Sequence, residues 1–167
     1  MTPEQFNAIY RAELGSITRF IARRVPDSEV EDLAGDLFEV AWQKRSSIPE
    51  GFEIPWLYKT ARYLISNSRR KLDNRKRIFD SLRPPTSAPS AESIALADME
   101  LGASWGKLKP QEREIIALWA LEGLSNKEIS IVIETSENAA AIRLTRAKAS
   151  LKYFLDLENQ SDVRTSN

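Results

Sequence analysis

The chain has 167 residues, of which 24 are basic and 24 acidic, and it contains neither histidine nor cysteine. Without these residues it lacks a disulfide framework, a thiolate metal site and the commonest general base. Because it also lacks a glycine-rich phosphate loop, an enzyme is the least favoured class, and we expect no cofactor and no metal.

No apolar stretch approaches the roughly 18 residues of a membrane span, and the N-terminus lacks the apolar core of a signal peptide. We therefore expect a soluble, cytoplasmic protein that does not contact a membrane. The charge is segregated along the chain: residues 1–58 hold six basic and ten acidic residues, whereas residues 59–83 hold nine and two. Such asymmetry predicts two partners of opposite charge.

The first predicted helix starts at Thr2-Pro3-Glu4-Gln5, where Thr2 caps the helix, proline takes the first position and Gln5 reaches back. Apolar residues then follow at helical spacing, and Pro26 ends the helix. This helix is expected to be mainly core.

Ser28-Glu29-Val30-Glu31 reads as a second capping box, which predicts a helix to about Arg45. Its apolar stripe includes Leu33 and is widened by Phe38. Four carboxylates align on another face at i, i+3, i+7 and i+10, namely Glu29, Asp32, Asp36 and Glu39. The row is either a docking face for a basic partner or a solvated surface, and the sequence favours neither. Asp32 and Asp36 could share a metal, but no further ligand is identifiable.

The central helix is predicted from Pro55 to about Arg77, with a packing stripe of Leu57, Ala61, Leu64 and Ile65. Its other faces combine cations with aromatic and amide side chains, which are Tyr58, Lys59, Arg62, Tyr63, Asn67, Arg69, Arg70 and Lys71. Cations neutralise phosphates and rings stack on exposed bases, so this pattern indicates nucleic-acid binding. The alternative is a solvated basic face. Trp56 fits a core position equally well.

A proline- and serine-rich segment at residues 81–92 has the composition of a linker. It separates two predicted helical domains at residues 1–80 and 93–158, and residues 159–167 are predicted to be a disordered tail. The predicted fold class is therefore all-α.

In the second domain, Pro110 is expected to open a helix that runs up to a C-cap at Gly123. Apolar residues repeat in it at helical spacing, namely Ile115, Leu118, Trp119 and Leu121. Ser125-Asn126-Lys127-Glu128 is a third capping box and opens a short helix. Thr135-Ser136 breaks it before a longer last helix. A short helix, a tight turn and a longer basic helix fit either a helix-turn-helix or an ordinary helical hairpin.

Three stretches, at residues 31–42, 55–63 and 108–148, together resemble the extracytoplasmic-function sigma factors of bacterial RNA polymerase, within the sigma-70 family. The resemblance covers nearly all of the chain in the right order. It implies a dissociable, non-catalytic polymerase subunit that selects promoters and helps to open them. The implied partners are core RNA polymerase and promoter DNA, and an anti-sigma factor is a further candidate.

The resemblance also assigns three sets of residues to these partners. The polymerase-binding set is Asp32, Leu33, Asp36, Phe38 and Glu39. The set for the minus-ten element is Trp56, Tyr58, Lys59, Arg62, Tyr63, Asn67, Arg69 and Arg70. The set for the minus-thirty-five element is Ser136, Asn138, Ala141, Arg143, Thr145, Arg146 and Lys148.

Four departures from the family pattern concern the promoter sequence rather than the architecture. Gly35, Tyr63 and Asn67 replace the usual glutamine, asparagine and aspartate, and Ala139-Ala140-Ala141 replaces a threonine-valine-lysine pattern. The rival interpretation is a stand-alone helix-turn-helix regulator, which leaves residues 31–42 and 56–77 without a role.

Overall fold

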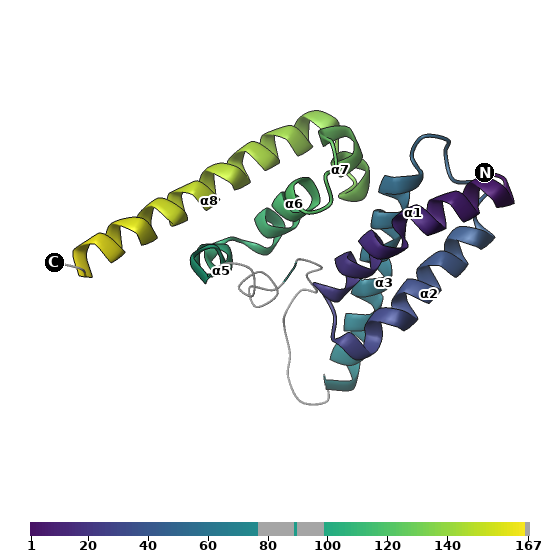
Figure 1. Ribbon diagram of the computed structural model, residues 1–167, viewed down its shortest axis with the longest axis horizontal. Helices are drawn as coiled ribbons and strands as arrows, with labels where there is room; N and C mark the ends of the chain where they lie inside the picture. The colour runs from purple at the N-terminus through teal and green to yellow at the C-terminus, as the bar shows by residue number, and fades with distance from the viewer. Residues whose placement is uncertain (77–88, 90–98, 166–167) are drawn as a thin grey trace. The chain divides into compact units, whose positions relative to one another are not determined.

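The computed structural model describes residues 1–76, 89 and 99–165, and within these ranges every regular element is an α-helix (Figure 1). The helices are α1 (Pro3–Ala22), α2 (Asp27–Gln43), α3 (Glu53–Lys76), α5 (Met99–Lys107), α6 (Pro110–Ala120), α7 (Asn126–Val132) and α8 (Glu137–Thr165). This confirms the predicted all-α class. The predicted linker at 81–92 lies outside the described residues except for Pro89.

The described helices fall into two compact units, one with α1 to α3 and one with α5, α6, α8 and most of α7. The boundaries at residues 80 and 93 remain predictions.

In the first unit α1, α2 and α3 pack on one another as a three-helix bundle (Figure 1). The rings of Phe20 on α1 and Tyr58 on α3 meet edge to face at its centre, with 5.0 Å between their centroids. Aliphatic side chains from all three helices fill the surrounding core, among them Ile17, Ile21, Leu37, Ala41, Leu57, Ala61 and Ile65.

Local capping chemistry sets the start of α1 as predicted. The Thr2 hydroxyl accepts a hydrogen bond from the Gln5 amide at 3.2 Å, and the Gln5 side chain accepts one from the Thr2 amide at 2.7 Å. The predicted box at Ser28 is wrong, because α2 begins at Asp27 with Pro26 as its N-cap and without a side-chain cap. Pro26 has φ −60°, which suits the residue before a helix, and the helix starts two residues earlier than predicted.

In the second unit α5 and α6 both pack on α8. Trp105, Leu108, Ile115, Leu118, Ile129, Ala140, Leu144 and Ala147 are buried there. Glu158 near the end of α8 accepts hydrogen bonds from the Ser104 hydroxyl at 2.7 Å and from the Lys107 ammonium at 2.8 Å. These two hydrogen bonds hold the pKa of Glu158 below its usual value, and the bond from Lys107 has the larger effect.

Two predicted features of the second unit hold and one does not. Pro110 opens α6, and the Ser125 capping box opens α7, with the Glu128 carboxylate accepting from the Ser125 amide at 2.8 Å. However, α6 ends at Ala120, and Gly123 at φ 68° lies in the turn that follows its C-cap, Leu121. In the structure α8 continues to Thr165. The disordered tail at residues 159–167 stays a prediction, since residues 166 and 167 lie outside the described residues.

Candidate functional site

The exposed carboxylates of α2 form an acidic row along one side of the first unit. Asp32, Asp36 and Glu39 are all exposed. Glu29, one turn before Asp32, is half-buried and accepts a hydrogen bond from the Ser68 hydroxyl on α3 at 2.5 Å. Glu29 therefore belongs to the packing of α2 on α3, and the acidic row proper consists of Asp32, Asp36 and Glu39.

Leu33 and Phe38 are largely buried, and of the two only Leu33 lines the groove between α2 and α3. They are only 8% and 6% exposed, respectively. The Phe38 ring meets Tyr10 of α1 edge to face, with 4.8 Å between centroids. Phe38 is thus covered by α1 and has little surface to offer a partner. A direct contact of Leu33 with the polymerase stays a prediction.

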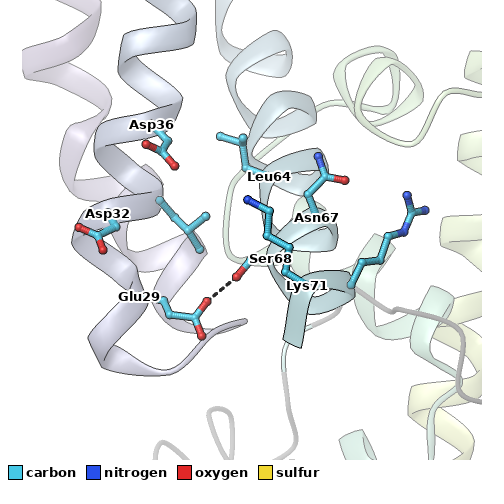
Figure 2. Close-up of a pocket in the computed structure, with 9 residues that line it drawn as sticks. Glu29, Asp32, Asp36, Leu64, Asn67, Ser68 and Lys71 are labelled. Atoms are coloured by element: carbon cyan, nitrogen blue, oxygen red, sulfur yellow. Dashed lines mark hydrogen bonds between the residues drawn. The ribbon is translucent and has the colours of Figure 1, made fainter. Parts of the chain in front are cut away.

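A groove of about 550 Å³ separates the acidic row from the cationic side of α3. Its α2 wall carries Asp32 and Asp36, and its α3 wall carries Asn67, Arg70 and Lys71. Figure 2 shows Asp36 and Lys71 both extending into the space between the two helices. Two walls of opposite charge suit a partner segment that carries both charge signs.

The aromatic residues of α3 separate into a buried and an exposed class. Tyr58 is 2% exposed and packs on Phe20, so the prediction that it stacks on a base is wrong. Tyr63 is 50% exposed, and its hydroxyl donates a hydrogen bond to the carboxylate of Glu134, which lies in the segment 131–134 that groups with the first unit. Trp56, in the first turns of α3, is half-buried and fits neither class cleanly.

The polar residues of α3 also differ in their exposure and hydrogen bonding. Asn67 and Arg70 are exposed. Arg69 is partly buried, and its guanidinium donates a hydrogen bond to the backbone carbonyl of Arg24 just beyond the end of α1. This bond gives Arg69 a role in packing α3 on α1. Lys59 and Arg62 are half-exposed on the same helix as Tyr63.

The N-terminal half of α8 carries the residues predicted to read DNA. The Ser136 hydroxyl accepts a hydrogen bond from the Ala139 amide at 3.1 Å, so Ser136 caps the helix. The side chains that follow line its outer surface, with Asn138, Arg143, Thr145 and Arg146 exposed and Ala141 half-exposed. The Thr145 hydroxyl donates to the Ala141 carbonyl at 3.0 Å.

Lys148 has a partner that the sequence did not reveal. Its ammonium lies over the ring of Trp119 on α6, 3.3 Å from the ring centroid. Trp119 and Leu121 repeat at helical spacing with Ile115 and Leu118, yet they are 44% and 45% exposed. Apolar spacing could not separate Trp119 from its buried neighbour Leu118, because both positions are compatible with a wide apolar stripe.

The described residues hold neither a candidate metal site nor a candidate membrane-spanning helix. Within residues 1–76 and 99–165 no three carboxylates cluster closely enough to hold a metal ion. Among the described helices none is long and apolar enough to cross a membrane.

The known proteins that the chain resembles are sigma factors of RNA polymerase. Residues 99–151, which include α5 to α7 and the first half of α8, match the family described as "Sigma-70, region 4". The chain is 28% identical over 140 residues to the RNA polymerase sigma factor NccH of Alcaligenes xylosoxydans xylosoxydans, covering 78% of this chain and 75% of that protein. It is 26% identical over 149 residues to the RNA polymerase sigma factor CnrH of Cupriavidus metallidurans, covering 81% and 78%.

Two solved structures have a similar fold. The sigma factor RpoE of Bartonella quintana, in complex with the anti-sigma factor NepR, matches with a TM-score of 0.68 at 20% identity, over 92% of this chain and 98% of that chain. CnrH in complex with the cytosolic domain of CnrY matches with a TM-score of 0.63 at 25% identity, over 93% and 90%.

Proposed function

Because the chain is an RNA polymerase sigma factor of the extracytoplasmic-function type, within the sigma-70 family, we propose how its residues divide the work of transcription initiation. The first unit binds core polymerase and the minus-ten element, and the second binds the minus-thirty-five element. The observation that carries this division is the separation of exposed charge, with carboxylates along α2 and cations along α3 and α8.

Core polymerase docks on the acidic row of Asp32, Asp36 and Glu39. These carboxylates are exposed, and Asp36 lies beyond the first turn of α2, where the helix dipole no longer explains an acid. The groove beside the row adds the cations of α3 to the same surface. A partner segment that is mainly basic and carries an occasional acid fits both walls.

The exposed side of α3 captures unstacked bases of the minus-ten element. Tyr63 offers a ring for stacking, Asn67 offers an amide for base edges, and Arg70 offers a cation for phosphate. Flipping a base out of the duplex costs a few kcal/mol. Stacking of that base on an aromatic ring contributes about 1–3 kcal/mol of binding free energy. Tyr58 takes no part, because it lies in the core.

The first half of α8 enters the major groove at the minus-thirty-five element. Residues near the N-terminus of a recognition helix meet base edges, which places Asn138 there and Arg146 at the backbone. The chain carries equal numbers of acidic and basic residues, so its own attraction to DNA is weak. Promoter binding therefore depends on assembly with the polymerase, in the cytoplasm.

An anti-sigma factor is proposed as a further partner. RpoE of Bartonella quintana is in complex with the anti-sigma factor NepR, and CnrH with the cytosolic domain of CnrY. CnrH is also similar to this chain in sequence. A protein of this kind would hold the chain away from the polymerase.

The test is run-off transcription by core polymerase and the purified chain on a library of random promoter sequences. We expect transcripts to start downstream of a shared two-part motif, and none to form with core polymerase alone. A chain that instead binds a palindromic duplex without polymerase, and yields no transcript with it, would be a stand-alone regulator.

A further inference from the structure

We infer that Trp119 is a positioning residue, which holds the ammonium of Lys148 in place for a phosphate contact beside the minus-thirty-five element. The inference rests on the proposed function, since it requires α8 to lie in the major groove. It assigns a role to a residue of α6, outside the recognition helix.

The contact itself is the first observation. The Lys148 ammonium lies 3.3 Å from the centroid of the Trp119 ring, close enough for a cation–π interaction. Trp119 is 44% exposed at the C-terminal end of α6, so burial alone does not account for a tryptophan there. Both residues lie in the second unit, where α6 packs on α8.

The position of Lys148 along α8 is the second observation. At about 100° per residue, Thr145 lies within about 20° of Asn138 around the helix axis, whereas Arg146 and Lys148 lie about 80° to either side. The predicted base-reading line therefore has a cation on each flank. Lys148 follows Asn138 by about 15 Å along the axis, more than the roughly 12 Å width of the major groove. When Asn138 meets base edges, Lys148 is at the level of the backbone.

Holding the ammonium over the ring has a consequence for affinity. A lysine side chain has many rotamers in solution, and ordering it on a phosphate loses that freedom. The ring restricts Lys148 before DNA arrives, while an ammonium has three donors and keeps its outward side open for a phosphate oxygen. The loss of freedom on binding is therefore smaller, and we expect the ring to strengthen DNA binding about two- to fivefold.

The experiment measures holoenzyme binding to a duplex recovered from the random-promoter selection, at several salt concentrations, for a double-mutant cycle. Trp119→Leu is expected to weaken binding about two- to fivefold and to leave the salt slope unchanged, because the phosphate contact survives. Lys148→Met is expected to lower the salt slope by about one unit. With Lys148→Met already present, Trp119→Leu should not weaken DNA binding further. As a single change, Trp119→Phe keeps a ring over the ammonium and should retain most of the affinity for DNA.

Two controls make the outcome decisive. In the chain alone, nuclear magnetic resonance should show the Lys148 methylene protons shifted by the ring, and Trp119→Leu should abolish this shift with unchanged circular dichroism. If Trp119→Leu weakens binding equally with and without Lys148, the ring acts on DNA directly and the inference is wrong. If Arg146→Ala lowers the salt slope but neither Trp119→Leu nor Lys148→Met has an effect, only this inference fails. If none of these three substitutions changes DNA binding or its salt slope, the proposed DNA interface on α8 is wrong.

Discussion

The Ser68 hydroxyl on α3 donates a hydrogen bond to the Glu29 carboxylate on α2 at 2.5 Å, which separates one acid of the predicted row from the others. Glu29 is half-buried and serves the packing of two helices. Asp32, Asp36 and Glu39 remain exposed and are available to a partner. The same sequence pattern thus contains two roles, and they can be tested against each other.

Replacing the exposed row should weaken polymerase binding without harming the fold. Changing Asp32, Asp36 and Glu39 to their amides is expected to reduce affinity for core polymerase about tenfold, at roughly 0.2–1 kcal/mol per exposed ion pair. The measurement is a titration of labelled chain with core polymerase at low and high salt, and salt should shrink the difference.

The matched control removes the hydrogen bond between Ser68 and Glu29 instead. Ser68→Ala is expected to lower the free energy of unfolding by about 1 kcal/mol, since the Glu29 carboxylate loses its partner. Polymerase affinity should stay nearly constant at a temperature where the variant remains folded. If the triple variant unfolds in urea as early as Ser68→Ala while keeping its affinity, the row is structural rather than a docking face.

Two tyrosines of α3 should behave in opposite ways. Tyr63→Ala is expected to reduce permanganate-detected promoter melting by the equivalent of about 1–3 kcal/mol, with less effect on the closed complex. Tyr58→Ala empties a core position beside Phe20 and should cost about 3 kcal/mol or more of unfolding free energy. Circular dichroism during urea titration separates the two effects. Equal losses of closed-complex formation and melting in Tyr63→Ala would contradict a stacking role.

Asn138 and Arg146 should separate sequence preference from general affinity. Changing Asn138 to alanine is expected to alter the preference at one base pair of the minus-thirty-five element by about 1–3 kcal/mol. Arg146→Ala should weaken every site similarly and lower the salt slope by about one unit. The measurement is holoenzyme binding to a panel of minus-thirty-five variants at several salt concentrations. The reverse pattern would mean that Arg146 reads bases and Asn138 contacts the backbone.

The carboxylate of Glu158 should make part of the stability of the second unit dependent on pH. Lys107 and Ser104 lower the pKa of this group from its ordinary value of 4.5, so the folded state favours the charged form. The resulting stability is fully present above pH 4.5 and is lost as the pH falls through the lower folded value.

Glu158→Gln tests this directly. The variant should melt at a lower temperature than the parent at pH 7, and the difference should shrink as the pH is lowered below 4.5. Thermal melts of both proteins between pH 3 and 7 give the comparison. A difference that is constant across this range would show that the carboxylate contributes packing rather than charge.

The sequence by itself determined those features that depend on neighbours in the chain. The starts of α1, α6 and α7 follow from Thr2, Pro110 and Ser125, because capping bonds span only three residues and proline presets its own backbone angle. The acidic row and the outer side of α8 were also predictable, since helical periodicity gathers charged residues on one side.

The tertiary structure alone decided which ambiguous side chains turn inward. An aromatic residue beside an apolar stripe suits core and surface alike, and the crossing of neighbouring helices selects between them. Tyr58 therefore lies against Phe20 while Tyr63 is exposed, and Trp119 meets Lys148 instead of the core. Contacts of this kind join residues tens of positions apart, and no local pattern encodes which helices will meet.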